Sequence, residues 1–303
     1  MKRLISLLVA VFFMTGMVVA QNNNATTSQE GDKNDAVQTQ MGASNDADIN
    51  QGVFGDKDPA VNMNRQNRGY AEQFQKGNNN EAVINQRSGS WGKYNYSLQR
   101  QVGNQNEAEV TFYNQGNHSE QIQRGNNNWS KAKSSNGKNE IYTTQVGNQN
   151  EAKALLLNSY FSEADIVQRG HVNFTDVDAK GERNDVVVRQ LGNNNDVKSR
   201  KDGDAGVIIR GDRNEIDITQ NGNQNQAWVQ NGKWGEADKS DIDFVQRGNG
   251  NYLEARVNSA YDNTVDAKQV GNNNYFRVLG IKGDYNDVTM VTRRHSNSGS
   301  WDI

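Results

Sequence analysis

The sequence predicts an all-β fold: a β-solenoid or cross-β stack of about ten coils, each of about 22 residues with two strands per coil. Three observations predict it. A glycine-centred motif recurs along the chain, residue types alternate with a period of two between its copies, and only 33% of the 303 residues are hydrophobic. So low an apolar content argues against one large globular core, and the regular period argues against disorder.

Residues 1–20 have the pattern of a secretory signal peptide. Lys2 and Arg3 provide a basic head, and an apolar run from Leu4 to Val19 follows. The run is too short for a stable membrane span. We therefore expect cleavage before Gln21 and export of the mature chain.

The chain contains no cysteine, which bounds its chemistry. An exported protein without cysteine cannot use a disulfide framework, and its three histidines, His118, His171 and His295, have no spacing suited to one metal ion. Lys and Arg number 33 against 36 Asp and Glu, and both signs are interspersed, whereas a nucleic-acid site needs clustered basic residues. The sequence therefore predicts no cofactor, no metal site and no nucleic-acid partner.

The strongest repeated unit is Gln-x-Gly-x-x-Asn, whose copies lie 22 to 30 residues apart with a base period of about 22. We expect its Gln, Gly and Asn to shape and lock the turns of the solenoid, and we assign no catalytic role to any of them. The nine copies are Gln75, Gly77, Asn80; Gln101, Gly103, Asn106; Gln123, Gly125, Asn128; Gln145, Gly147, Asn150; Gln168, Gly170, Asn173; Gln190, Gly192, Asn195; Gln220, Gly222, Asn225; Gln246, Gly248, Asn251; and Gln269, Gly271, Asn274.

A second, weaker unit lies halfway between these copies and reads Gly-Asp/Glu/Lys-x-Asn-Asp/Glu. It divides each coil into two half-repeats of about 11 residues, one amide-rich and one charged at its turn. Inserted stretches at 88–90 and 198–205 account for much of the extra spacing between some copies. Copies of the second unit occur at 137–140, 181–185, 211–215 and 283–287, and the whole repeat region is 29–291, with a degenerate phase before Gly77.

Alternation within each half-repeat predicts a β-strand with one buried face. The same-parity positions read Asn184, Val186, Val188 and Gln190 in one copy, while the positions between them carry charged residues and Thr. The glycine after each Gln can take a left-handed conformation without steric cost, so we expect a tight turn there. Ten such coils, about 4.8 Å apart, would make a rod of roughly 50 Å.

The inward-facing amides predict how the rod holds together. A buried amide without a partner would cost ~1–3 kcal/mol. If the coils stack in register, each Gln or Asn side chain can donate to the one above and accept from the one below. We therefore expect ladders of Asn and Gln along the rod, with Ala, Val and Ile filling the space between the sheets.

The motif resembles the curlin repeat of bacterial curli fibres, a functional amyloid. The resemblance covers most of 29–291, and a motif repeated this often is specific even though one copy would be weak. It is closest where Ala follows two residues after the Asn, as in Gln101, Gly103, Asn106, Ala108; Gln145, Gly147, Asn150, Ala152; Gln75, Gly77, Asn80, Ala82; and Gln220, Gly222, Asn225, Ala227.

This resemblance implies a function and partners. It implies an extracellular, pilus-like fibre at the cell surface that acts in cell adhesion and biofilm matrix. The implied partners are the chain itself, other curlin-like subunits, an outer-membrane export pore with its accessory factors, and a host or surface matrix. Residues 21–28 occupy the place of the curlin export-targeting segment. The chain is longer than a five-repeat curlin and its half-repeats are unequal, so its role as major subunit, nucleator or cap stays open.

Three other functions are less favoured. An enzyme would need a unique pair of desolvated carboxylates, whereas Asp202, Asp204, Asp241 and Asp243 recur with the repeat, outward or in turns. Calcium-binding solenoids use paired glycines in nonapeptides, and the glycines here are single. The alternative that we retain is a monomeric secreted β-solenoid that binds carbohydrate or ice.

Two features bear on that alternative. Ice binding predicts a regular outward row of Thr, which the repeat lacks, and glycan binding predicts exposed aromatic residues. Trp91, Trp129, Trp228 and Trp234 are scattered, which favours packing over a binding ladder. The tail at 292–303 leaves the repeat and is expected to be a cap or a docking arm, because the last coil of a solenoid has an open edge.

Overall fold

Two parallel β-sheets make up the described part of the chain. The structure is a computed structural model and describes residues 22–29, 34–52, 69–86, 94–112, 116–135, 137–156, 162–180, 183–197, 206–208, 214–230, 240–256, 263–277 and 287–293. Several predictions concern residues outside these ranges: the signal peptide at 1–20, the insertions at 88–90 and 198–205, Trp91, Trp234, His295, Asp202, Asp204, and the tail after 293.

The first sheet, here called sheet A, has nine strands, and the second, sheet B, has twelve. Sheet A contains β1 (Asn24–Gln29), β3 (Asp46–Gln51), β5 (Glu81–Gln86), β7 (Glu107–Phe112), β9 (Trp129–Lys131), β11 (Glu151–Lys153), β13 (Phe174–Thr175), β15 (Asp196–Val197) and β17 (Gln226–Ala227). Sheet B contains β2 (Asp35–Met41), β4 (Gly69–Lys76), β6 (Asn95–Val102), β8 (His118–Arg124), β10 (Glu140–Asn148), β12 (Glu163–His171), β14 (Asp185–Leu191), β16 (Asn214–Asn221), β18 (Ser240–Arg247), β20 (Ala267–Val270) and β21 (Met290–Thr292), with β19 (Asn263–Thr264) beside β18.

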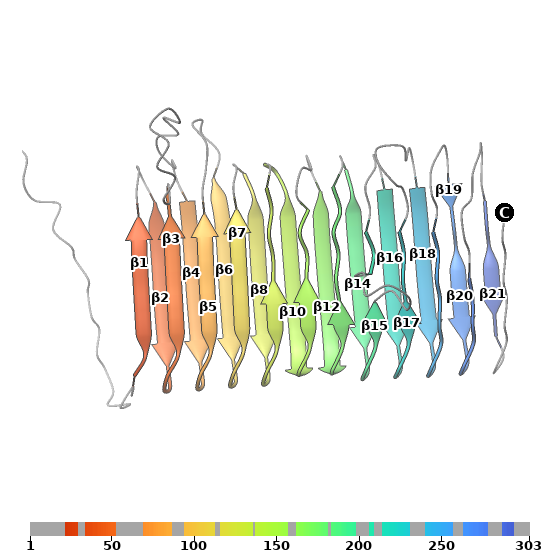
Figure 1. Ribbon diagram of the computed structural model, residues 1–303, viewed down its shortest axis with the longest axis horizontal. Coiled ribbons are helices and arrows are strands. Elements are labelled where there is room, and N and C mark those ends of the chain that lie inside the picture. Colours follow the sequence, from red (N-terminus) through yellow and green to blue (C-terminus); the bar gives the residue numbers. More distant parts are fainter. Residues whose placement is uncertain are drawn as a thin grey trace, which may run out of the picture.

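The chain alternates between the two sheets, so each strand pairs in parallel with the strand of the previous coil. Residues one repeat apart are therefore neighbours: Gln145 lies opposite Gln168, and Gly147 opposite Gly170. The strands stand side by side along a straight rod (Figure 1). This arrangement confirms the predicted β-solenoid with coils of about 22 residues. No helix long and apolar enough to cross a membrane occurs among the residues described above.

The number of regular coils is slightly smaller than the predicted ten. Sheet A has nine strands, so its strands from β1 to β17 span eight turns of the solenoid. Beyond β17 this side of the rod continues only as single bridges, from Gln226 to Tyr252 and from Tyr252 to Tyr275. The motif predicted these turns correctly, but the short sheet A segments there do not form extended strands.

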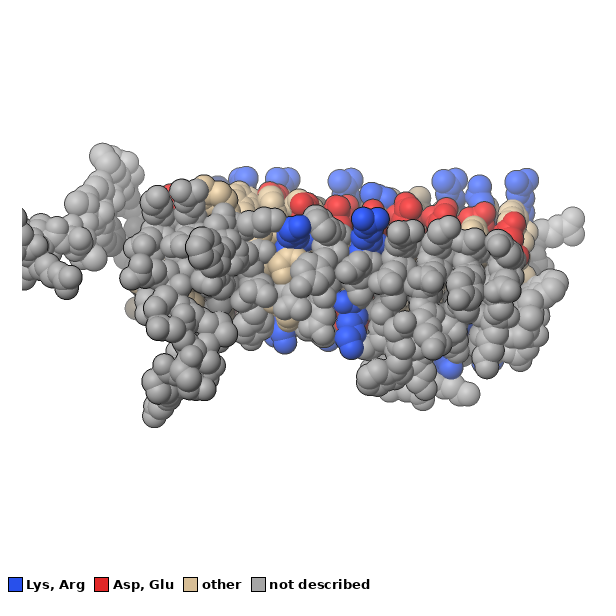
Figure 2. Space-filling model, turned by 90° about the horizontal axis from the view of Figure 1, so that it is seen from above, with Lys and Arg blue, Asp and Glu red and all other residues tan. Residues whose placement is uncertain are grey.

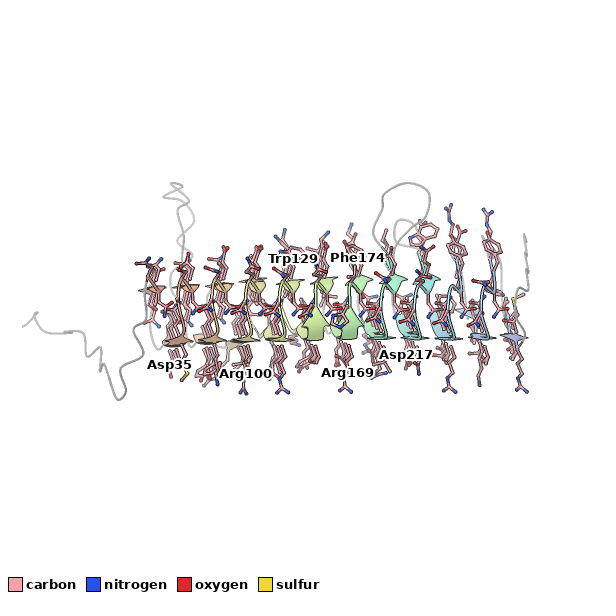
Figure 3. All side chains as sticks on the ribbon, turned by 90° about the horizontal axis from the view of Figure 1, so that it is seen from below. Asp35, Arg100, Trp129, Arg169, Phe174 and Asp217 are labelled. Atoms are coloured by element: carbon pink, nitrogen blue, oxygen red, sulfur yellow. The ribbon has the colours of Figure 1, made fainter. Side chains whose placement is uncertain are left out.

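Burial follows the predicted alternation. In β5 and the residue before it, Asn80, Ala82, Ile84 and Gln86 are each at most 1% exposed, while the residues between them are exposed or half-buried. Figure 3 shows the two layers edge-on, with Trp129 and Phe174 pointing outward from one layer and Arg100, Arg169 and Asp217 from the other. The buried side chains fill the narrow space between the layers.

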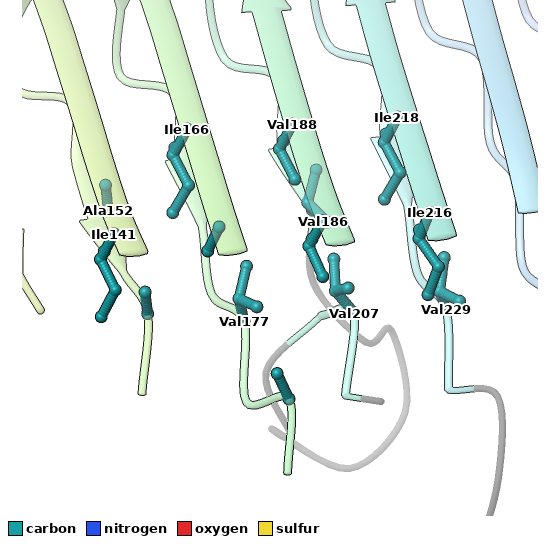
Figure 4. Close-up of a cluster of buried hydrophobic side chains, with 14 of the residues drawn as sticks. Ile141, Ala152, Ile166, Val177, Val186, Val188, Val207, Ile216, Ile218 and Val229 are labelled. Atoms are coloured by element: carbon teal, nitrogen blue, oxygen red, sulfur yellow. The ribbon is translucent and has the colours of Figure 1, made fainter. Parts of the chain in front are cut away.

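The filling between the sheets changes along the rod. One inward row of sheet B runs through Gln73, Gln99 and Gln121 and then changes to Thr143 and Ile166. Beyond this point the interior is aliphatic, with Ile, Val and Ala packed together (Figure 4). The N-terminal coils thus combine a second glutamine row with apolar residues such as Ile49, Ile84 and Val110, whereas the C-terminal coils replace that row by further apolar burial, which contributes roughly 25 cal/mol per Å².

The two long edges of the rod differ. At the edge where sheet B strands end, every turn has the same length, Gly-x-x-Asn, and the residue before the Asn usually adopts positive φ, as in Asn127 (55°) and Asn194 (54°). At the other edge the connections vary in length, and the sequence insertions all follow a sheet A segment. One turn departs from the pattern: Val172 occupies the positive-φ position at 56° with 47% of its surface exposed.

We expect Val172→Asn to stabilise the solenoid by ~1 kcal/mol. A β-branched residue is strained in the left-handed region, whereas Asn tolerates it, and the exposed Val side chain loses little packing. Urea unfolding followed by circular dichroism measures the change. The matched control is Asn127→Val, which places the same strain in an unstrained turn and should destabilise by a similar amount. Equal stability of both variants and the parent would contradict the strain argument.

Candidate functional site

The glutamines of the repeated motif form one continuous ladder inside the rod. All nine are at most 1% exposed. The Nε2 of each donates to the Oε1 of the glutamine in the following coil, at 2.9–3.0 Å, from Gln75 to Gln269. Gln40, which lies before the first predicted copy, extends the ladder by donating to Gln75 at 2.9 Å.

The same glutamines also join the two sheets. The second hydrogen of each amide is donated to a backbone carbonyl on the opposite side of the rod: Gln145 Nε2 lies 2.8 Å from the carbonyl oxygen of Trp129, and Gln123 Nε2 lies 2.8 Å from that of Glu107. Each glutamine from Gln75 to Gln246 therefore makes two bonds as donor, and all but the first accept from the motif glutamine before them, which satisfies a buried amide.

The asparagines of the motif form a second ladder at the turns. The Nδ2 of each asparagine donates one hydrogen to the Oδ1 of the asparagine in the preceding coil, at 3.0–3.2 Å. It donates the other hydrogen to a glycine carbonyl of the following coil, at 2.8–2.9 Å. Asn23 and Asn45 continue this ladder toward the N-terminal end.

The glycines of the motif stack on one another. The nine glycines have φ between 115° and 128°, a region that side chains disfavour. A Cβ built on Gly147 would overlap the carbonyl oxygen of Gly170, and the same holds along the row from Gly77 to Gly248. Glycine is needed here because of both its conformation and the closeness of the next coil.

The two ladders run in opposite directions. The glutamine amides donate toward the C-terminal end of the rod, whereas the asparagine amides donate toward the N-terminal end. At the N-terminal end, Gln40 therefore carries the first Oε1 of the glutamine ladder. At the other end, in the last described strand, Thr292 lies opposite Gln269 in place of a glutamine. The Oγ1 of Thr292 is buried without a hydrogen-bond partner in the described structure.

Three further ladders lie beside those of the motif. Two run inside the N-terminal coils, and one runs along the exposed turns, where each Asn Oδ1 accepts a backbone N–H from the preceding coil. Alternation in the sequence predicted an inward Gln86, but the ladder through Gln73 and the ladder of the exposed turns were missed. Paired Gln-x-Gln spacings, as at Gln73 and Gln75, were a usable signal for the first of these two. The three ladders are Gln29, Gln51, Gln86; Gln38, Gln73, Gln99, Gln121; and Asn78, Asn104, Asn126, Asn148, interrupted by His171 and resumed at Asn193, Asn223, Asn249, Asn272.

The other edge of the rod is less regular, as its weaker motif predicts. Asn139 follows Asn117 in a short ladder there, in which the backbone N–H of Asn139 donates to Asn117 Oδ1 at 3.2 Å. Ser162 replaces Asn in the next coil and donates to Asn184 Oδ1 at 3.2 Å, which reverses the direction of the ladder. This edge holds together without a single continuous row of amides.

Two of the four tryptophans weighed as a binding face are described, and they differ: Trp129 points outward from sheet A (Figure 3), and Trp228 is buried. The indole N–H of Trp129 donates to Glu107 at 3.0 Å, and Trp228 is only 4% exposed, with the Arg256 guanidinium 4.3 Å from its ring centre. His118 packs between two tyrosine rings of sheet B. Among the described residues no three His, Cys, Asp or Glu side chains are grouped to hold a metal ion.

Carboxylates line the outer face of sheet B in its C-terminal half. Glu163, Asp185, Glu215 and Asp241 lie opposite one another on successive strands. Burial, followed by repulsion from neighbouring carboxylates, raises the pKa of each of them, and also that of Asp243. Figure 2 shows these residues as a red band along one side of the rod, with Lys and Arg in blue beside it.

Comparison with known proteins gives no family for this chain. No protein-family model matches the sequence, and no curated protein matches it either. The resemblance to the curlin repeat therefore stays a prediction from the motif itself. The motif forms two opposed amide ladders beside a stacked row of glycines, and this arrangement is the strongest indication of function in the described structure.

We expect Gln145→Leu to destabilise the solenoid by ~2–4 kcal/mol. Leu leaves the Nε2 of Gln123 and the Oε1 of Gln168 buried without their partner, at ~1–3 kcal/mol each. Chemical denaturation measures the loss. Gln226→Leu is the control, because the side chain of Gln226 points outward, and it should change stability by less than ~0.5 kcal/mol. Equal effects at both positions would show that the buried ladder contributes no more than a surface residue.

We expect the rod to become more stable as the pH falls from neutral toward the ordinary carboxyl pKa of about 4. The pKa values of Asp185, Glu215 and Asp241 are raised in the folded chain, so their contribution is greatest below the ordinary carboxyl pKa of about 4 and is lost as the pH rises through the folded values. Urea unfolding at several pH values measures this slope. Asp185→Asn combined with Asp241→Asn should flatten it. An unchanged slope in this variant would exclude the carboxylate row as its cause.

Proposed function

We propose that this chain is a structural, non-catalytic subunit of an extracellular, curli-like amyloid fibre that is pilus-like and acts in cell adhesion and biofilm matrix. The observation that carries the proposal is the pair of opposed amide ladders, which run the length of the rod. A ladder of this kind is extended by any further coil that brings the same residues in the same register.

End-to-end stacking of copies follows from the polarity of the ladders. Gln40 carries an Oε1 at the N-terminal end, and its own Nε2 already donates to Gln75 and to the backbone of Asn24. A donor from the C-terminal coil of another copy suits that oxygen. Head-to-tail stacking continues both ladders in their own directions, whereas two N-terminal ends would set each ladder against its own reverse. Every coil adds parallel strands, and an open parallel edge readily templates another strand. Head-to-tail growth is therefore the favoured mode.

The proposed location and partners rest on the sequence. The segment at 1–20 fits export, and the motif fits a curlin-like subunit that leaves the cell through an outer-membrane pore. In this proposal the fibre forms outside the cell, from this chain and other curlin-like subunits, and contacts a host or surface matrix. Its sites are the ladder residues themselves, because assembly is the activity.

The direct test is assembly of the purified mature chain, residues 21–303. We expect amyloid-dye fluorescence to rise after a lag and electron microscopy to show unbranched fibres. A chain that stays monomeric and folded, without fibres, would overturn the proposal and favour a monomeric solenoid that binds carbohydrate or ice. Binding of polysaccharides to that monomer then tests the alternative.

We expect Gln40→Lys to slow fibre growth several-fold without unfolding the chain. Lysine keeps donors for Gln75 Oε1 and the Asn24 carbonyl but removes the acceptor that the next copy would use. The control Thr39→Lys adds the same charge on the same strand with its side chain pointing outward. Seeded growth rates measure both. Equal rates for the two variants would count against growth through this ladder.

A further inference from the structure

The outer face of sheet B separates its charges into two bands. Each strand presents four outward positions, and acidic residues gather at the first two and basic residues at the last two. The acidic band consists of Asp35, Glu72, Glu120, Glu140, Glu163, Asp165, Asp185, Glu215, Asp217, Asp241, Asp243, Asp266 and Asp287, and the basic band of Lys76, Arg100, Arg124, Arg169, Arg189, Arg247, Lys268 and Arg293.

Single strands carry both signs at fixed positions. On β12, Glu163 occupies the first outward position and Arg169 the last, and on β18 the same positions hold Asp241 and Arg247. Six residues of extended chain place the two charges ~20 Å apart. At that distance in water they scarcely interact, because the Debye length is ~8 Å at physiological salt.

The charges of this face are largely not paired with one another. Among its described residues, the ion pairs within 4.0 Å are Arg189 with Asp165, at 3.8 Å, and His118 with Glu120, at 3.0 Å. The outer face of sheet A differs. There Lys131 contacts Glu109 at 2.8 Å, and Lys153 contacts Asp176 at 2.9 Å. The basic residues Lys131 and Lys153 of sheet A are thus paired on their own face, and sheet A also carries a row of carboxylates at Asp46, Glu81 and Glu107. Sheet B instead leaves two bands of opposite sign available to a partner.

Exposed apolar side chains lie on the same face. Val37, Met41, Val146 and Val291 are 42%, 48%, 37% and 51% exposed, and all four point outward from sheet B. The sequence predicted only charged residues and Thr at such positions. The apolar residues lie singly, on β2 and β21 at the two ends of the sheet and on β10 between them, so the charged bands and not an apolar patch are the feature that a partner would recognise.

We propose that two copies of this chain pair through the outer faces of sheet B, with their rods parallel and a two-fold axis running along the rods between them. This rotation places the strand starts of one copy over the strand ends of the other. Glu163 then faces Arg169 of the second copy, and Asp241 faces Arg247, each pair occurring twice. Rods that ran in opposite directions would bring acidic band against acidic band.

The area of the face is sufficient for a stable pair. Eleven strands of sheet B lie in one path, and at ~4.8 Å per strand and ~23 Å of strand length they offer ~1,200 Å² per copy. A standard protein interface buries about 800 Å² per partner. Pairing therefore goes beyond end-to-end growth and does not depend on it, because a single rod already presents enough surface.

Repulsion within the acidic band favours a partner that brings basic groups to it. Burial, followed by repulsion from neighbouring carboxylates, raises the pKa values of Glu163, Asp185 and Asp241 in the single rod. Guanidinium groups from a facing copy would relieve that repulsion. The same bands explain the choice of partner, because only a surface with the inverse order of charges matches both at once.

Charge reversal tests the pairing in the full mature chain. One variant carries Arg169→Glu with Arg247→Glu, and the other carries Glu163→Lys with Asp241→Lys. Sedimentation of soluble chain and electron-microscopic fibre width are measured at 20 mM and 500 mM salt. We expect the parent to pair at low salt and separate at high salt. Each variant alone should stay single, and a mixture of both should pair, with one label of each kind in every pair.

The control is Lys131→Glu with Lys153→Glu on the outer face of sheet A. It changes the net charge by the same amount as Arg169→Glu with Arg247→Glu, and it should leave pairing intact. Pairing of either sheet B variant alone, or failure of the mixture to pair, overturns the inference. Single-width fibres of the parent at low salt overturn pairing and leave the fibre proposal standing. Soluble pairs without fibres do the reverse, so the two proposals fail separately.

Discussion

The structure depends on one constraint: a buried side-chain amide must find an identical amide one coil away. With no cysteine, the rod keeps the glutamines and asparagines of its repeated motif at most 1% exposed, and each is satisfied only while neighbouring coils stay in register. A slip by one residue would turn every amide outward. The constant turn length at the Gln-Gly edge and the stacked glycines both maintain this register. They keep Gln145 opposite Gln123 in one neighbouring coil and Gly147 opposite Gly170 in the other.

Features that the ladders do not require are free to vary. The opposite edge accepts connections of different length, and the ladder there reverses at Ser162 without disturbing the strands. The core also changes from glutamine to aliphatic residues after Thr143, whose Oγ1 is left without a hydrogen-bond partner in the described structure. Apolar packing can substitute for one amide row because the remaining row, through Gln145 and Gln168, continues past the change.

Much of the fold was predictable from the sequence, because period and parity are local properties. The inward positions of Asn80, Ala82 and Gln86 follow from alternation alone, and the turn follows from Gly77. The short sheet A segments near Tyr252 and the extra ladders were not predicted. Both features depend on which residue of the neighbouring coil lies opposite. Because the insertions differ in length, spacing along the sequence does not identify that residue. The apolar residues on the outer face of sheet B were missed for a related reason: parity shows which way a side chain points, not what it meets there.

The opposed directions of the two amide ladders have an electrical consequence. Aligned amides add their dipoles, and a single long row would build up partial charge at its two ends, as a helix does. Here the motif's glutamine row and its asparagine row point in opposite directions along the same axis, so the dipoles of these two rows oppose each other in every coil. The N-terminal coils carry further glutamine rows, through Gln51 and Gln73, that point the same way as the motif glutamines. The offset is therefore closest in the C-terminal half, where aliphatic side chains replace the row through Gln73.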